Sequence, residues 1–290
     1  MKLDIFSHCT IDTIEFGDIV TEQIGGVACY GGLTARKLKF DVNLHTKFGL
    51  DFPHDEYLTK NKLTHKNTQS NKLTTRFTIK LSGSDRTMYL ENTCDPIEYE
   101  YSKADGFLVS PVFDEISSLT FDNLKKDCSF IFLDPQGFLR RVDSEKKVFL
   151  EKTNIALSKI NTIKLSYDEI IALSDGSTVE NMKNIQKRGV KHVLLTNKKE
   201  ISLLANDRIY SIILPNNEVY DTTGLGDIFF TTFCCTLLKE NDFLWALCFA
   251  GGAAQAALDT KEFGLKKIPE KNDIETNGSY FYNTVKFKQV

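Results

Sequence analysis

The sequence lacks most of the features that would assign it to a class at once. It has no excess of basic residues, since 36 Lys and Arg stand against 39 Asp and Glu, a formal net charge of −3. That balance argues against nucleic acid as the main partner. The seven cysteines include no C-x-x-C pair and the five histidines show no metal-ligand spacing. Neither a disulfide framework nor a histidine metal site is therefore expected.

Targeting, membrane and P-loop signals are also missing. The N-terminus lacks the basic, apolar and small-residue order of a signal peptide, and there is no G-x-x-x-x-G-K-[ST] stretch of a Walker-type ATPase. The longest mostly apolar run, residues 243–258, is too short and too rich in Gly and Ala for a membrane span and predicts a buried helix. We expect a cytoplasmic protein without a membrane partner. Its 290 residues suffice for one large α/β domain or two small ones.

The most informative stretch is Asp221-Thr222-Thr223-Gly224-Leu225-Gly226-Asp227, which runs directly into an apolar segment over residues 228–240. The glycines allow a tight turn, and the apolar segment predicts a buried helix. Such a turn leaves main-chain N–H groups and the positive end of the helix dipole facing an anion, most often phosphate. A carboxylate repels phosphate, so Asp227 is interpreted as a base that deprotonates a nucleophile attacking that phosphate. The alternative is a plain helix cap.

Strands and helices alternate along much of the chain. Strands are expected over residues 3–9, 42–48, 106–110, 130–133, 160–165 and 190–196, and helices over residues 113–124 and 177–188. Strands separated by helices of this length indicate βαβ units and a mainly parallel sheet. Alternating Thr and apolar residues over 73–81 and 87–91 predict a hairpin.

Two further positions are expected to meet a ligand. Asp12 follows just beyond the first expected strand, and ligands of open α/β sheets gather outside the carboxyl ends of strands. A turn residue is the alternative. Gly25 and Gly26 precede an expected helix, and a glycine pair lets the backbone approach a ligand closely. The alternative there is an ordinary glycine-rich turn.

Three segments carry a resemblance to a known family. The stretch from Asp221 to Asp227 resembles the signature D-T-x-G-A-G-D of the ribokinase-like (PfkB) carbohydrate kinases, with Leu225 in place of Ala. Residues 25–32 resemble the family's G-G-x-x-x-N-x-A signature, with Tyr30 where Asn is frequent. The sequence D-P-Q-G-F-L-R of residues 134–140 is most similar to the archaeal and plant myo-inositol kinase-like branch.

The resemblance covers essentially the whole chain and implies one domain over residues 1–290. Its fold would be the three-layer ribokinase-like α/β fold, with a mainly parallel central sheet flanked by helices. A small β lid, built from about residues 13–24 and 73–91, would close over the acceptor and expel water. A homodimer through this lid is also implied.

The implied activity is transfer of the γ-phosphoryl group of ATP to a hydroxyl of a small sugar or polyol, with myo-inositol favoured. Asp227 would be the base, and the N–H groups of Gly224, Leu225 and Gly226 would stabilise the transferred phosphoryl group. A nucleoside kinase of the same fold and a non-catalytic sugar-binding or regulatory relative stay open as alternatives.

Further site residues follow from the resemblance alone. The acceptor would be bound by Asp12, Gly25, Gly26 and Arg140. ATP would be contacted by Thr196, Lys198, Thr223, Gly224 and Gly251. Glu169 would hold Mg²⁺ through water, with Ser166 at the Asn of an N-x-x-E motif. Asp221, with Thr223, would bind the monovalent cation that some members use. The alternatives are a solvated Arg140, a surface Glu169 and tight helix packing at Gly251.

Overall fold

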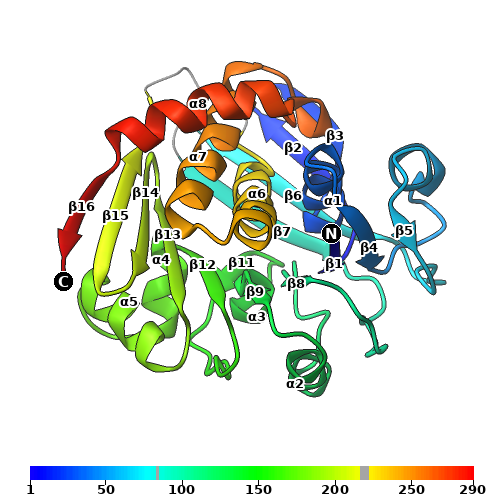
Figure 1. Cartoon of the computed structure of the whole chain (residues 1–290). Coiled ribbons are helices and arrows are strands. Elements are labelled where there is room, and N and C mark those ends of the chain that lie inside the picture. The colour runs from blue at the N-terminus through cyan, green and yellow to red at the C-terminus, as the bar shows by residue number, and fades with distance from the viewer. Residues whose placement is uncertain (83–84, 216–221) are drawn as a thin grey trace.

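Ten strands form the central sheet of the computed structural model, which describes residues 1–82, 85–215 and 222–290 (Figure 1). In spatial order they are β16 (Lys286–Gln289), β15 (Arg208–Ile213), β14 (Glu200–Ala205), β13 (His192–Asn197), β12 (Thr162–Ser166), β9 (Ile131–Leu133), β8 (Gly106–Val109), β1 (Lys2–Phe6), β4 (Asp41–His45) and β5 (Thr64–His65). Neighbours from β13 to β5 run parallel, and β13 to β16 pair antiparallel along one edge. The predicted mainly parallel sheet is confirmed.

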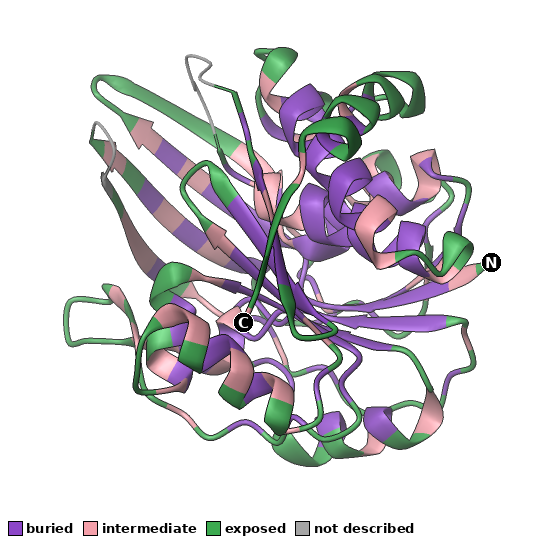
Figure 2. Cartoon of the chain, turned by 60° about the vertical axis from the view of Figure 1, so that its left-hand side comes forward, coloured by how far each residue is buried: buried purple, intermediate pink, exposed green. Residues whose placement is uncertain are grey.

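Helices cover both faces of this sheet and give three layers (Figure 1). One face carries α1 (Val27–Lys37), α6 (Leu225–Glu240), α7 (Phe243–Asp259) and α8 (Lys271–Thr284). The other carries α2 (Ser118–Asp127), α4 (Tyr167–Leu173) and α5 (Thr178–Lys187). Each layer of helices buries its own apolar cluster against the sheet. The central helices α6 and α7 are buried along most of their length, as Figure 2 shows in purple, because their residues are apolar on nearly every side.

A smaller four-stranded sheet is built from the two segments expected to form a lid, and we call it the lid sheet. Its strands lie in the order β3 (Ile19–Gly25), β2 (Thr10–Phe16), β6 (Thr75–Ser82) and β7 (Asp85–Asn92). β2 runs parallel to β6, and the outer pairs are antiparallel. Burial alternates along β6, and Figure 2 shows this banding, because one face of the lid sheet packs on an apolar cluster that includes Val112.

The first strand is shorter than the sequence indicates. β1 ends at Phe6 and not at residue 9, because the chain leaves the central sheet there. The N–H of Cys9 then donates to Thr46 Oγ1 at 2.9 Å, and β2 begins at the next residue. Asp12 therefore lies within the lid sheet and not just beyond the end of a central strand.

The helix expected over residues 113–124 also begins later. Ser117 caps α2 by accepting a hydrogen bond from the N–H of Thr120. The residues before it form a loop, in which the buried carboxylate of Glu115 accepts the N–H groups of Val112 and Phe113, both at 2.7 Å. A side chain that satisfies backbone donors in this way competes with a helical path.

The apolar run over residues 243–258 forms the buried helix that the sequence predicts, α7. None of the helices in the described part of the chain has both the length and the apolar character needed to cross a membrane. Each of the seven cysteines is a free thiol.

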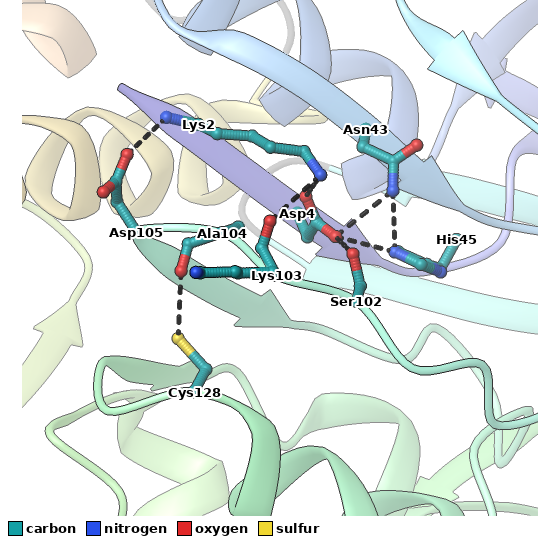
Figure 3. A network of polar contacts seen from close by, with 9 residues as sticks. All are labelled: Lys2, Asp4, Asn43, His45, Ser102, Lys103, Ala104, Asp105 and Cys128. Atoms are coloured by element: carbon teal, nitrogen blue, oxygen red, sulfur yellow. Dashed lines mark hydrogen bonds and ion pairs between the residues drawn. The ribbon is translucent and has the colours of Figure 1, made fainter.

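A buried carboxylate joins the strands on the side of the sheet near the N-terminus (Figure 3). Asp4, on β1, is fully buried and accepts hydrogen bonds from Asn43 at 3.2 Å, from His45 at 2.9 Å and from Ser102. Its second oxygen lies 3.4 Å from the ammonium of Lys2. Burial alone would raise the pKa of Asp4, but the hydrogen bonds outweigh it and hold that pKa below its ordinary value.

We expect Asp4→Ala to lower the free energy of unfolding by about 3 kcal/mol at neutral pH, because buried donors lose their acceptor. A depressed carboxyl pKa stabilises the fold above the ordinary value of about 3.9 and ceases to do so as the pH falls through the folded-state pKa. The difference between wild type and variant in urea unfolding should therefore shrink in acid. The exposed Asp41, on the neighbouring strand β4, supplies the control Asp41→Ala. Equal losses for both variants would contradict this account.

Candidate active site

One cleft gathers most of the residues that the sequence singles out. It lies between the lid sheet and the N-terminus of α6, and polar side chains from several elements face into it. The sequence-predicted residues among those lining it are Asp12, Gly26, Arg140, Thr223, Gly224, Gly226 and Asp227. Residues separated by more than 200 positions therefore meet at one place.

The turn over residues 222–227, which we call the anion turn, forms the N-terminus of α6. Gly224 has φ +76° and ψ −4°, in the left-handed region, and a Cβ there would lie 2.5 Å from the ring of Tyr30. Both the conformation and the close ring require glycine. Tyr30, at the position where the family often has Asn, thus packs directly on the anion turn and lines the cleft.

The main-chain donors of the anion turn differ in part from the prediction. The N–H of Leu225 donates back to the carbonyl of Thr222 at 3.1 Å and is not directed to the cleft. For the N–H groups of Gly224 and Gly226 no acceptor is found among the described residues. The donors available to an anion are therefore those of the two glycines, and Leu225 is corrected to a turn-forming role.

Asp227 lies in the first turn of α6 and is partly exposed to the cleft. Gly224 occupies the N-cap position and the helix has no side-chain cap, so the cap alternative for Asp227 does not hold. Burial raises the pKa of Asp227 to about 7, with Asp134 adding to the rise and Lys164 opposing it. A carboxylate with a pKa near neutrality suits a general base.

Lys164 is a residue of this site that the sequence reasoning missed. It lies in the middle of β12, is 7% exposed, and its ammonium contacts Asp134 at 2.6 Å. The same ammonium would lie 3.5 Å from a Cβ on Gly226, so it stands against the anion turn. Burial disfavours the charge, but Asp134, Glu169 and Asp227 together raise the pKa of Lys164 above its ordinary value. A permanent positive charge therefore faces the place where an anion would bind.

Asp12 presents an unsatisfied acceptor to the cleft. It is 6% exposed, and its Oδ1 has no hydrogen-bond partner among the described residues. Burial raises the pKa of Asp12 to about 6. A Cβ on Gly25, on the neighbouring strand β3, would lie 2.3 Å from Asp12 Oδ2, so a larger residue there would displace this carboxylate. A buried carboxylate oxygen without a partner is suited to accept a ligand hydroxyl.

Arg140 is held at the cleft and is not a solvated surface residue. Its guanidinium donates to the carbonyl of Val112 at 2.9 Å and to Gln136 Oε1 at 2.6 Å, and lies 5.8 Å from the centre of the Phe77 ring. Gln136 and Phe77 also line the cleft. Gly26, the N-cap of α1, has φ +80°, and a Cβ there would lie 2.4 Å from the carbonyl of His8.

Several predicted nucleotide contacts lie elsewhere. Thr196 is at the end of β13 and donates to the carbonyl of Leu165 at 3.3 Å, and Lys198 is exposed in the following turn. Gly251 is buried in α7, where a Cβ would lie 2.2 Å from Ile212 and 3.3 Å from Phe281. Tight packing around α7 is sufficient to explain why residue 251 is glycine. Contact of Thr196, Lys198 and Gly251 with ATP stays a prediction. Asp221 lies outside the described residues.

Glu169 is buried and not a surface residue. It forms a capping box with Ser166, the N-cap of α4: Glu169 Oε2 accepts the N–H of Ser166 at 2.7 Å, and Ser166 Oγ accepts the N–H of Glu169 at 3.3 Å. Burial raises the pKa of Glu169, against the attraction of Lys164. In the described part of the chain, no three His, Cys, Asp or Glu side chains gather into a metal site. Mg²⁺ bound with substrate phosphates needs only one or two carboxylates. Glu169 is not among the residues that line the cleft, and its role toward Mg²⁺ stays a prediction.

These elements define a class of fold: a mainly parallel sheet between helices, a β lid and a glycine turn that opens a buried helix, the ribokinase fold. No family model matches the chain. A pyrophosphate-dependent kinase of the ribokinase family, solved with a pyrophosphate analogue and myo-inositol, superposes with a TM-score of 0.81 at 18% identity, over 94% of this chain and 99% of that one. Ribokinase of Arabidopsis thaliana, solved with ribose and ATP, superposes with a TM-score of 0.73 at 16% identity, over 96% and 98%.

The sequence comparison points in the same direction. The inositol 3-kinase of Arabidopsis thaliana is 24% identical over 240 residues, which covers 78% of this chain. The match spans 65% of the plant enzyme, just under two thirds of its length. The chain is therefore similar in sequence and in fold to kinases of the ribokinase family, including inositol kinases, as the sequence motifs predict.

Proposed function

We propose that the chain is a kinase that transfers the γ-phosphoryl group of ATP to a hydroxyl of a small polyol, with myo-inositol as the favoured acceptor. One observation carries the proposal. A carboxylate with a pKa of about 7, Asp227, shares a cleft with two glycine N–H donors and with the unsatisfied Oδ1 of Asp12. A base, an anion site and a hydroxyl acceptor are the three groups that this transfer needs.

In the proposed reaction Asp12 and Arg140 bind acceptor hydroxyls and direct one of them toward Asp227. Asp227 takes the proton of that hydroxyl while its oxygen attacks the γ-phosphorus, and the bond from phosphorus to the bridging oxygen of ADP breaks. The N–H groups of Gly224 and Gly226 and the ammonium of Lys164 stabilise the charge on the transferred group. Mg²⁺, when bound beside the phosphates through water on Glu169, would neutralise part of their charge.

The walls of the cleft support a ring polyol as acceptor. Asp12, Gln136 and Arg140 offer polar contacts, while Phe77 and Met88 of the lid sheet form an apolar wall. Hydroxyls suit the first set and the C–H face of a ring suits the second. The inositol kinases among the similar proteins add support. The apolar wall also suits a nucleobase, so a nucleoside acceptor is the second candidate.

An acceptor panel tests the proposal. The purified chain would be assayed with ATP and Mg²⁺ against myo-inositol, ribose, fructose, adenosine and cytidine, following acceptor-dependent ADP formation. We expect the highest kcat/KM for myo-inositol. A preference for adenosine or cytidine would move the assignment to a nucleoside kinase. Binding of a sugar by calorimetry without turnover on any acceptor would indicate a non-catalytic relative. A parallel series with pyrophosphate tests the donor, since a similar kinase depends on it.

The pH profile of kcat/KM should report the two raised carboxyl pKa values. The base must be deprotonated, so activity should fall about tenfold for each pH unit below the pKa of Asp227, which is about 7. Below about 6, protonation of Asp12 should also weaken acceptor binding, and the slope should steepen. A flat profile from pH 7 to 5 would contradict the role of Asp227.

A further inference from the structure

A second lysine lies behind the anion turn. Lys267 ends the short 3₁₀ helix η2 (Gly264–Lys267), is 1% exposed, and donates from its ammonium to the carbonyl of Thr223 at 2.9 Å. Lysine is almost never fully buried unless its ammonium is paired, because desolvation of the charge costs several kcal/mol. One contact of this ammonium is therefore with the backbone of the anion turn.

The contact sets the direction of a main-chain donor. The carbonyl of Thr223 and the N–H of Gly224 belong to one planar trans peptide and point in opposite directions. Because Lys267 holds that carbonyl on its own side, the N–H of Gly224 is turned away from Lys267, toward the cleft that Gly224 lines. Lys164 stands at the cleft side of the same turn, 3.5 Å from where a Cβ of Gly226 would be. Two ammonium groups therefore bracket the turn.

The fixed ammonium bears on the monovalent cation that some ribokinase-like kinases use at this turn. Such a cation needs several oxygen ligands, main-chain carbonyls above all. Thr223 is one of the two residues that the family resemblance implies for this cation, and here its carbonyl already accepts a hydrogen bond from a compact ammonium with the same single charge. The carbonyl of Thr223 in this chain therefore does not fit the role of a ligand for a monovalent metal ion from solution.

We propose that Lys267 is a built-in monovalent cation, which orients the anion turn and makes the chain independent of added potassium. The proposal rests on the proposed function in so far as the turn binds the transferred phosphoryl group. Lys267 does not touch substrate and acts through the peptide between Thr223 and Gly224, so it is a positioning residue.

The first test needs no variant. Turnover by the wild-type chain should be the same in sodium, potassium and ammonium chloride at equal ionic strength. Stimulation by potassium or ammonium over sodium would overturn the proposal. The second test uses Lys267→Ala, which we expect to lower kcat by about 100-fold, as for loss of one oriented donor. Added ammonium or methylammonium should raise the kcat of this variant roughly tenfold, and sodium should not raise it.

The neighbouring Lys266 is exposed and supplies the matched control, since Lys266→Ala removes the same charge one residue away and should change neither kcat nor ion dependence. Wild-type kcat in a folded Lys267→Ala, or loss without ammonium rescue, would contradict the positioning role. Calorimetric binding of pyrophosphate separates this inference from the proposed function. Binding that weakens in Lys267→Ala and recovers with ammonium supports the inference even if no acceptor is phosphorylated, and binding that stays unchanged overturns it.

Discussion

Asp227→Asn should lower kcat about a thousandfold and leave the KM for the acceptor and the affinity for ATP near their wild-type values. Asparagine keeps the size of the side chain and its place in the first turn of α6 but cannot accept the proton of the attacking hydroxyl. Burial raises the pKa of Asp227 to about 7, so ionising this carboxyl destabilises the folded protein as the pH rises above the ordinary value of about 3.9, and does so in full above about 7. The variant should therefore unfold at the same temperature as wild type, or a higher one, in alkaline buffer.

Glu240, exposed at the opposite end of α6, provides the matched control. Glu240→Gln makes the same change of charge on the same helix and should leave kcat and its pH profile unchanged. Initial rates, acceptor titrations and thermal unfolding of the three proteins are the measurements. Turnover by Asp227→Asn close to that of wild type would remove Asp227 from the role of base.

Lys164→Met should have the second-largest effect. Loss of the ammonium against the anion turn should lower kcat by about 100-fold, because a preorganised charge no longer faces the transferred group. The same substitution leaves the carboxylate of Asp134, 1% exposed, without its partner at 2.6 Å. We therefore expect the free energy of unfolding to drop by about 3 kcal/mol as well.

A double variant separates these two consequences. Lys164→Met combined with Asp134→Asn removes both charges, so urea unfolding should return toward wild-type stability. Its kcat should stay low, since the cation at the anion turn is still missing. Recovery of turnover together with stability would show that Lys164 only keeps Asp134 satisfied and does not act on the phosphoryl group.

The parts of the site that could be predicted are those coded by a short run of residues. The glycines of the anion turn and the apolar segment after them specify a turn and a buried helix locally, and α6 begins at Leu225 as a result. Asp227 follows from the same run, because its distance along the chain fixes its place on the helix. The parallel sheet could be predicted equally well, since the strands and helices alternate at the spacing of βαβ units.

Residues whose role depends on a distant partner were harder to predict. Asp12 was expected at the end of a central strand, but the chain changes sheets after Phe6 and carries it into the lid sheet. That change depends on contacts such as Cys9 with Thr46, which sequence spacing does not show. Asp12 still reaches the cleft, because residues of the lid sheet and of the anion turn line it together.

Lys164 left a signal that could have been used. Lys164 stands between Ile163 and Leu165, in the middle of a strand that is otherwise expected to be buried. Burying its ammonium lowers the stability of the fold unless a carboxylate faces it. The partner, Asp134, directly follows the neighbouring strand β9, and only the sheet order brings the two together. Lys267 gave no such signal, because its segment of mixed charged and apolar residues is typical of a surface loop.

The central claim is that this cleft joins a phosphoryl group to an acceptor hydroxyl, and phosphorus NMR tests it most directly. Wild-type chain, ATP, Mg²⁺ and myo-inositol should give a phosphomonoester signal that grows in step with ADP. That signal should be absent when the acceptor is omitted or when Asp227→Asn replaces the wild type. Equal release of orthophosphate with and without acceptor, and no monoester from any polyol, sugar or nucleoside with either ATP or pyrophosphate, would contradict the account.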